Sequence, residues 1–252
     1  MSSEKINFSN STGHQLAAII EFPDVVDLSG FAVFAHCFTC NKNLTAVKNI
    51  GRALTDNGIA VLRFDFTGLG ESEGDFEDTN FSSNVDDLLY AAKFLENEYK
   101  EPDILIGHSL GGAAVIAASA KIGSVKAVAT IGAPSSPSHV AHLFKSGIEE
   151  INNNGIAAVT IGGRNFTIKK QFLVDIEESK IKQVVHDMRK PILILHSPQD
   201  KTVGIENAAQ IYQSAMHPKS FISLDSADHL LSDSKDSIYT GKMIATWAKR
   251  YI

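Results

Sequence analysis

Residues 104–112 have the sequence Ile-Leu-Ile-Gly-His-Ser-Leu-Gly-Gly, and a run of small, mostly apolar residues follows at 113–120. The branched apolar residues predict a buried strand, and the small-residue run predicts a helix. Ser109 lies at the junction, with Gly107 two positions before it and Gly111 two positions after it. Glycines at these positions let strand and helix approach closely while the serine takes a strained backbone conformation. A turn of this kind exposes a serine hydroxyl as a candidate nucleophile.

The residue after this serine supplies a second requirement of nucleophilic chemistry, a donor for a developing oxyanion. Leu110 begins the predicted helix, so its N–H lies at the positive end of the helix dipole. A glycine-flanked serine also occurs in ordinary turns, but the preceding strand and the following helix favour the nucleophile.

The composition is that of a globular protein with a substantial core, because 44% of the 252 residues are hydrophobic and 21% are charged. We expect one domain over residues 1–252. A net charge of −6 and the absence of a basic cluster argue against nucleic acid and anionic membranes as partners. No apolar run approaches the roughly 20 residues of a membrane span. Residues 1–5 lack the apolar stretch of a signal peptide, which predicts a cytoplasmic location.

Short apolar strands alternate with amphipathic helices along most of the chain. Strands are predicted at 5–8, 15–21, 31–35, 59–64, 104–106, 125–131, 192–195 and 221–224, and helices at 44–57, 81–95, 113–120, 204–214 and 235–250. The first two strands flank a turn and predict an antiparallel start. The later alternation predicts a parallel sheet covered by helices on both faces, with the loops after the strands gathered at one edge.

Residues 135–190 interrupt this alternation, with a helical pattern at 138–153, a hairpin pattern at 159–168 and a helical pattern at 171–187. An insertion at this position emerges at the edge that carries Ser109, so we expect a small cap over the site. Its candidate apolar wall residues are Leu143, Phe144, Ile148, Phe166 and Phe172. We predict Phe144, Ile148 and Phe166 as substrate contacts, with the alternative that they form the core of the cap itself.

Two loops at the same edge carry the partners that a nucleophilic serine needs. Asp200 follows the strand at 192–195, and His229 follows the strand at 221–224. We predict His229 as the general base and Asp200 as the carboxylate that orients it. Asp225 is the rival acid, whereas Asp228 is too near His229 in the sequence to face its ring.

Other histidines lie near these positions and have simpler interpretations. His108 precedes the serine and should point away from it, supporting the turn. His196 ends a strand, and we expect it to support the loop of the acid rather than to take part in the chemistry.

The loop after the strand at 31–35 should provide the second oxyanion donor, and we predict the backbone N–H of Phe38. Cys37 occupies a position where a loop that supplies the second oxyanion donor often has glycine. Cys37 and Cys40 form a Cys-x-x-Cys pattern between a strand and a helix, which is typical of thiol redox sites. They can also be half of a metal site or two small loop residues, and no further cysteine is present to build a disulfide framework. We favour two small loop residues, and predict no metal and no cofactor.

Three motifs carry a specific resemblance: residues 36–40 (His-Cys-Phe-Thr-Cys), residues 63–74 (Arg-Phe-Asp-Phe-Thr-Gly-Leu-Gly-Glu-Ser-Glu-Gly) and residues 107–112. With residues 191–200 and 227–229, they are similar to the α/β-hydrolase domain that is fused to OsmC-like domains in bacteria. The resemblance implies an eight-stranded, mostly parallel sheet and a serine hydrolase with Ser109, Asp200 and His229 as its triad. The printed sequence covers the hydrolase part of that arrangement only.

These patterns together predict the hydrolysis of small carboxylic esters, with short to medium acyl chains, through an acyl-enzyme on Ser109. A thioesterase, an amidase or a peptidase uses the same acyl-transfer chemistry and stays an alternative. A hydrolase fold that only binds its ligand, and a thiol redox protein using Cys37 and Cys40, are alternatives from other classes. The oligomeric state is not determined by these patterns.

Overall fold

Eight strands form one sheet in the computed structural model, which describes residues 2–24 and 28–252. In chain order they are β1 (Ser2–Ser9), β2 (Gln15–Phe22), β3 (Gly30–Ala35), β4 (Ile59–Phe64), β5 (Ile104–His108), β6 (Ala127–Ile131), β9 (Ile192–His196) and β10 (Lys219–Ser223). The order across the sheet is β1-β2-β4-β3-β5-β6-β9-β10. β2 is antiparallel to both β1 and β4, and every other neighbouring pair is parallel. The predicted eight-stranded, mostly parallel sheet with an antiparallel start is confirmed.

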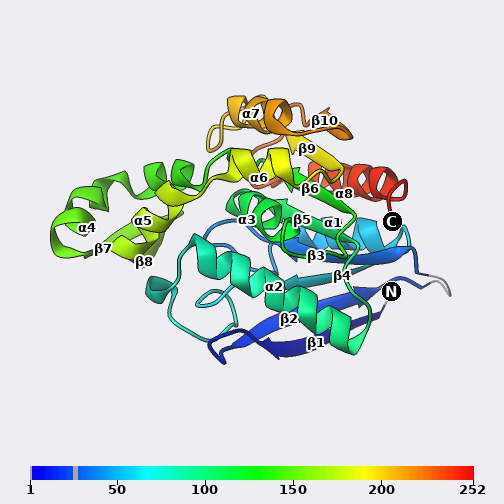
Figure 1. Ribbon diagram of the computed structural model, residues 1–252, viewed down its shortest axis with the longest axis horizontal. Helices are drawn as coiled ribbons and strands as arrows, with labels where there is room; N and C mark the ends of the chain where they lie inside the picture. The colour runs from blue at the N-terminus through cyan, green and yellow to red at the C-terminus, as the bar shows by residue number, and fades with distance from the viewer. Residues whose placement is uncertain (1, 25–27) are drawn as a thin grey trace.

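Helices cover both faces of this sheet (Figure 1). One face packs against α2 (Phe81–Glu98), α3 (Leu110–Ser119), α6 (Ile181–Asp187) and α7 (Glu206–Ser214), and the other against α1 (Thr45–Thr55) and α8 (Ser234–Ala248). Two hydrophobic clusters result, one containing Leu88 and Val115 and the other containing Ile50 and Ile244. Strands β3 to β6 are buried along their whole length, as expected for parallel strands between two helical layers.

The segment at 135–190 projects from one end of the sheet as far as α5, at the left of Figure 1, whereas its last helix, α6, lies on the sheet. It contains the 3₁₀ segment η2 (Pro137–Gly147), α4 (Ile148–Asn154), the antiparallel pair β7 (Ile156–Ile161) and β8 (Arg164–Lys169), and α5 (Lys170–Glu178). The predicted hairpin is therefore present.

The two helices predicted in this segment are not continuous. Phe144 leaves the helical conformation with φ −129° and ψ 30°, and its ring is buried at that break. Ser179 has an extended backbone and separates α5 from α6. The predictions of one helix over 138–153 and one over 171–187 are wrong, because apolar periodicity does not register a local turn that leaves the buried side chains in place.

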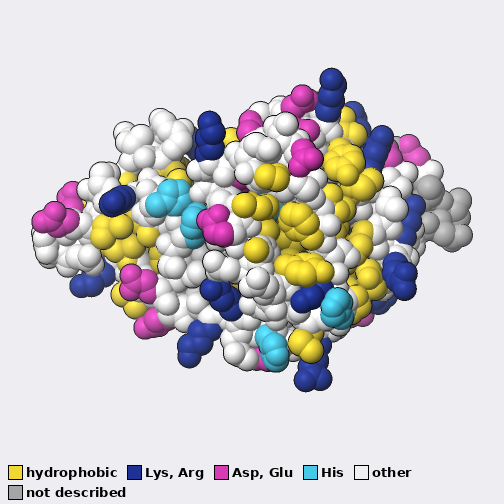
Figure 2. Space-filling view, turned by 90° about the horizontal axis from the view of Figure 1, so that it is seen from above, with side chains coloured by type: hydrophobic (Ala, Val, Ile, Leu, Met, Phe, Trp, Pro, Cys, Tyr) yellow, Lys and Arg dark blue, Asp and Glu magenta, His cyan; other side chains and the backbone are white. Residues whose placement is uncertain are grey.

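Apolar side chains are exposed at the free edge of the sheet, where β10 has a single neighbouring strand. Figure 2 shows hydrophobic side chains gathered on this face, over α7 and β10. Phe221 is 44% exposed, and it lines a shallow hollow with Ile205, Ala208 and Tyr212. Within the described parts of the chain, no helix has both the length and the apolar character needed to cross a membrane.

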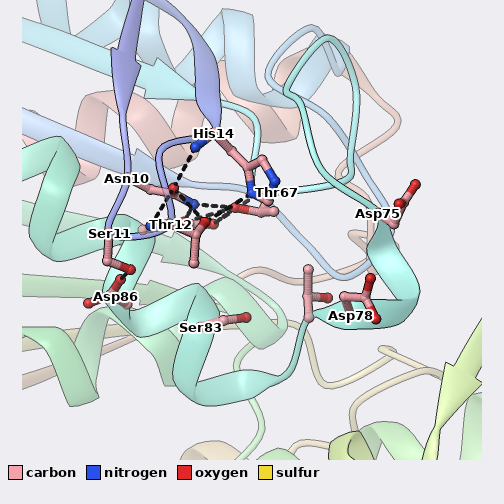
Figure 3. A pocket seen from close by; sticks show the side chains of 11 residues that line it. Asn10, Ser11, Thr12, His14, Thr67, Asp75, Asp78, Ser83 and Asp86 are labelled. Atoms are coloured by element: carbon pink, nitrogen blue, oxygen red, sulfur yellow. Dashed lines mark hydrogen bonds between the residues drawn. The ribbon is translucent and has the colours of Figure 1, made fainter.

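A polar network joins the β1–β2 turn to the loop after β4 and to α2 (Figure 3). The Asn10 amide donates to Thr67 Oγ1 at 2.9 Å and to Asp87 Oδ1 at 3.1 Å. The Thr67 N–H donates to Asp87 Oδ2 at 2.9 Å. Burial raises the pKa of the Asp87 carboxyl above its ordinary value. These bonds fix the first hairpin against the body of the sheet.

A buried ionic network holds the loop that follows β3, at residues 36–43. The Lys42 ammonium lies 2.6 Å from Asp65 Oδ2 and also contacts Glu71 at the surface. Both Lys42 and Asp65 have side chains that are almost completely buried. Arg63 donates to the Lys42 carbonyl at 2.7 Å and pairs with Glu21 at 2.9 Å. The network therefore fixes the carboxyl-terminal end of a loop whose first residues approach Ser109.

The Lys42–Asp65 pair provides a test of this anchoring. Asp65→Asn leaves the Lys42 charge buried beside a neutral amide, so we expect the free energy of unfolding to fall by about 3 kcal/mol, near the lower limit for breaking a buried ion pair. Urea denaturation measures this loss. Glu71→Gln is the matched control, because that carboxylate contacts the same ammonium from an exposed position, and its loss should change stability far less. Equal effects of the two substitutions would contradict the anchoring role of Asp65.

Candidate active site

Ser109 lies at the turn from β5 to α3, with φ 55° and ψ −127°. The turn is tight, because a Cβ at Gly107 would lie 2.3 Å from the Gly111 carbonyl oxygen. A Cβ at Gly111 would lie 2.4 Å from the carbonyl oxygen of His36, at the end of the neighbouring strand. Both positions therefore require glycine, and the strained turn that the sequence predicts is present.

His229 lies between the other two predicted residues. Its Nε2 is 2.9 Å from Ser109 Oγ, and its Nδ1 is 2.7 Å from Asp200 Oδ2. The hydroxyl donates to Nε2, and the Nδ1 proton is donated to the carboxylate. The structure thus brings together Ser109, Asp200 and His229, which come from the loops after β5, β9 and β10.

The Asp200 carboxylate is held in place by its own loop. Its Oδ1 accepts the N–H groups of Thr202 at 2.8 Å and Val203 at 2.9 Å, which leaves Oδ2 to His229. Burial alone would raise the pKa of Asp200, but the hydrogen bond and charge of His229 and the two N–H groups lower it below its ordinary value. The carboxylate is therefore ionised and oriented.

The two rival carboxylates have other partners. Asp225 accepts the Ser223 hydroxyl at 2.6 Å, and Asp228 accepts the Ser232 N–H at 2.8 Å. Both side chains belong to the loop of His229 itself, where they shape the turn.

Two neutral histidines brace these loops. His108 Nε2 donates to the backbone carbonyl of His229 at 2.6 Å, and His196 Nε2 donates to the carbonyl of Val203 at 2.7 Å. Burial lowers the pKa of His196 and holds the pKa of His108 at about 3. The expected support by His196 for the loop of the acid is present. His108 supports the loop of the base as well as the turn, a contact that sequence reasoning missed.

The loop after β3 lies beside the start of α3. Phe38 and Leu110 line the same small cavity. Leu110 is the first helical residue, where an N–H has no partner within its own helix. His36 Nδ1 donates to the Cys37 carbonyl at 2.9 Å, and Cys40 donates its N–H to the same oxygen at 3.0 Å. These bonds fix the backbone on both sides of Phe38.

Cys37 and Cys40 form a disulfide, with a Cα–Cα distance of 5.3 Å. The interpretation of these cysteines as two small loop residues did not anticipate this bond, which forms because the turn around Phe38 brings their sulfur atoms together. The bond closes a single turn and joins no separate elements of the fold.

A cavity of about 690 Å³ opens at Ser109 and His229. The segment at 135–190 contributes Leu143, Ile161, Gly162 and Arg164 to its wall, and the rest comes from the loop after β3, the start of α1 and the loops of the acid and the base. Polar Asn and Thr side chains alternate with apolar ones along this wall. Arg164 is the only Lys, Arg, Asp or Glu among the described residues that line it. The polar cavity of Figure 3 shares none of these residues.

The predicted substrate contacts lie behind this wall. Phe144 packs against the ring of Phe38, with centroids 6.4 Å apart, and against Phe172. Phe166 packs against Phe76 at 4.9 Å, and Ile148 packs against the hydrophobic core. None of Phe144, Ile148 and Phe166 is among the residues that line the cavity. These side chains are packing residues, as the alternative expects, but they pack against the main hydrophobic core and the loops beside it as well as within the segment.

The sheet order, the strained serine and the ring between hydroxyl and carboxylate define an α/β-hydrolase of the serine hydrolase and esterase class. The chain belongs to the Hydrolase_4 family, described as serine aminopeptidase, S33, which matches residues 32–165.

Individual relatives agree with this class. The crystal structure of the esterase domain of a Rhodothermus marinus protein is 49% identical, with a TM-score of 0.83 over 100% of this chain and 99% of the other. Ferulic acid-bound Est1E from Butyrivibrio proteoclasticus has the same fold, at 20% identity and a TM-score of 0.78 over 95% and 98%. The mitochondrial palmitoyl-protein thioesterase ABHD10 of Rattus norvegicus is 26% identical over 81% of this chain and 70% of its own length.

The buried His108 makes stability depend on pH. An unfolded histidine binds a proton near pH 6.5, whereas the folded His108 stays neutral down to about pH 3. The unfolded chain therefore binds more protons between these values, and the free energy of unfolding falls as pH drops through this range. We expect His108→Gln to reduce this fall by about 1.4 kcal/mol per pH unit.

Urea unfolding between about pH 4.5 and about pH 7.5 measures that slope. His142→Gln, at an exposed histidine, should keep the slope of the parent protein. A parental slope in His108→Gln would show that the buried ring is not a source of acid sensitivity.

Proposed function

We propose that the protein hydrolyses carboxylic esters through an acyl-enzyme on Ser109. The observation that carries this proposal is the His229 ring, which contacts Ser109 Oγ and Asp200 Oδ2 through its two nitrogens. A serine hydroxyl becomes a nucleophile when a base accepts its proton and a carboxylate stabilises the resulting imidazolium.

The reaction proceeds in two halves. His229 Nε2 takes the hydroxyl proton as Ser109 Oγ bonds to the ester carbonyl carbon. The tetrahedral intermediate then expels the alcohol, which receives that proton from His229, and the acyl group stays on Ser109. Water attacks the acyl carbon next, giving its proton to His229, and the acid leaves as Ser109 Oγ regains the proton.

The N–H groups of Leu110 and Phe38 serve as the oxyanion hole in this proposal. Leu110 lies at the positive end of the α3 dipole, and the Phe38 backbone is held by the His36 bond and by the adjacent disulfide. Fixed donors of this kind stabilise the negative charge without reorganising during the reaction.

The segment at 135–190 acts as a cap within a single domain in this proposal. Leu143 and Ile161 are the apolar side chains that it presents to the cavity. Because Asn and Thr side chains interrupt the apolar parts of the wall, the cavity offers no continuous apolar surface for a long hydrocarbon chain, and it favours short to medium acyl chains. The similarity to OsmC-like fusion proteins and the cytoplasmic location stay predictions.

An aminopeptidase is less compatible with this cavity, although the family carries that description. A free α-amino group is cationic and requires an acidic side chain or a cluster of acceptors. The described wall contains no Asp or Glu, and its single cation, Arg164, repels such a group. A thioester uses the same steps as an ester, and the substrate panel below includes one.

Kinetics on p-nitrophenyl esters and a matched thioester test the proposal. Ser109→Ala should lower kcat by roughly three to six orders of magnitude, because the members of a triad act as a unit. Asp200→Asn should lower kcat by roughly four orders of magnitude, because the amide no longer fixes the tautomer of His229. Turnover at the parental rate in Asp200→Asn would refute the assigned acid.

Two controls make the result specific. Asp225→Asn changes a carboxylate in the loop of His229 that contacts Ser223 instead, and it should keep most of the activity. The pair Cys37→Ser with Cys40→Ser should still hydrolyse esters if the enzyme is a serine hydrolase, at a reduced rate because the disulfide beside the Phe38 backbone is lost. Activity that survives Ser109→Ala but is lost in the cysteine pair would favour the thiol redox alternative.

A further inference from the structure

Arg164 lies at the point where the segment at 135–190 meets the loop after β3. It is the first residue of β8, next to the glycine turn of the hairpin, and it lines the cavity that contains Ser109. Its guanidinium donates to the backbone carbonyl of Thr39 and lies 5.4 Å from the centre of the Phe166 ring. These two contacts hold the side chain at the mouth of the cavity.

No carboxylate pairs with this guanidinium in the described parts of the chain. Its contacts there are a neutral carbonyl and an aromatic ring, so most of its five N–H donors are available. The two buried cations beside the loop after β3 do have carboxylate partners: Arg63 pairs with Glu21, and Lys42 pairs with Asp65. Arg164 differs from these in facing a cavity that opens at the candidate nucleophile.

The charge around Arg164 is opposite to that of the whole protein. The chain has a net charge of −6, yet the described lining of the cavity contains no Asp or Glu. A guanidinium is always charged and matches a carboxylate with two parallel hydrogen bonds. A neutral substrate carbonyl can accept one hydrogen bond from the guanidinium, whereas a carboxylate can accept two parallel ones and adds charge attraction.

We propose that Arg164 binds an ionised carboxylate on the substrate, so that the preferred esters carry a second carboxyl group. This inference rests on the proposed esterase function and adds the substrate class to it. The scissile carbonyl lies at Ser109, while the free carboxylate lies at the cap side of the cavity between Arg164 and the loop of Thr39. Arg164 is then a specificity residue that acts at a distance from the bonds that break.

Two series of esters locate the carboxylate. The first contains the monoethyl esters of succinate, glutarate and adipate, each matched with the ethyl ester of a neutral acid of similar length. The second contains the acetate esters of hydroxybenzoates, matched with the acetates of cresols, and places the carboxylate on the alcohol side. Proton release during hydrolysis gives kcat/KM for each compound. We expect an anionic preference of roughly 10- to 100-fold in at least one series.

Substitution of Arg164 links this preference to the guanidinium. Arg164→Gln should reduce the ratio of kcat/KM between anionic and neutral partners to near one, and Arg164→Lys should leave an intermediate ratio, because a point charge replaces the planar fork. Lys170→Gln is the matched control, since it removes a positive charge in the same segment from a residue that does not line the cavity. It should keep the parental ratio. Added salt should reduce the ratio in the parent protein, because Arg164 is exposed.

Binding provides a readout that does not depend on turnover. Calorimetry with Ser109→Ala and the preferred anionic ester should show a Kd that rises roughly 10-fold or more when Arg164→Gln is added. The inference would be overturned if the parent protein preferred the neutral esters in both series. It would also be overturned if Arg164→Gln lowered kcat/KM equally on anionic and neutral esters, because Arg164 would then be a tether between the segment and the loop of Thr39. Failure of the esterase proposal itself is distinguishable, because hydrolysis of neutral esters would then be absent or would survive Ser109→Ala.

Discussion

The backbone of Ser109 imposes the constraint on which the rest of the site depends. A non-glycine residue at φ 55° is strained, and it persists only where the surroundings leave no alternative. Here β5 enters the turn from the centre of the sheet, α3 leaves it at once, and the end of β3 presses against Gly111. The strained turn therefore requires three features together: a central position in the sheet, glycine at both flanking sites and a buried α3. They hold the hydroxyl where the loops after β9 and β10 can reach it.

Neutral, buried histidines fix the loops of the site by hydrogen bonds to their backbones. His36 directly follows β3, while His108 and His196 end β5 and β9, and each contacts a backbone carbonyl beyond its strand. A charged side chain at these positions would require a buried counter-ion, whereas a neutral imidazole supplies one donor at little desolvation cost. The loop after β3 has a second anchor in the Lys42–Asp65 pair. The loops of the site are thus fixed by hydrogen bonds between buried side chains and single backbone atoms.

The sheet and the three clustered residues could be predicted from the sequence, because their signals are local. Apolar runs predicted the strands, and the positions of Asp200 and His229 just after strands predicted that they share an edge of the sheet.

The breaks at Phe144 and Ser179 could not be predicted, since they depend on how rings pack in the finished segment. The residues that line the cavity could not be predicted either. Phe144, Ile148 and Phe166 are apolar, and only the structure shows that they pack behind the cavity wall and do not line it. The Cys37–Cys40 bond depends on a turn that spacing alone allows but does not require. Arg63, a charge within an apolar strand, was the available signal for the ionic network.

The strained Ser109 opens into a cavity whose described lining has one cation and no carboxylate. The wall combines apolar side chains with Asn and Thr and has a single arginine, and we propose that it takes a small ester with a negative charge on its acyl or alcohol part. In this view the fold supplies the nucleophile, and the segment at 135–190 supplies the choice of substrate.

The most direct test of the central claim is to identify the side chain that a fluorophosphonate labels, using peptide mass spectrometry on the intact protein. We expect one adduct, on Ser109, formed by displacement of fluoride, with a labelling rate that falls by orders of magnitude in His229→Ala. An adduct on another residue, or labelling of Ser109 at the parental rate without His229, would contradict the assignment of Ser109 as a nucleophile activated by His229.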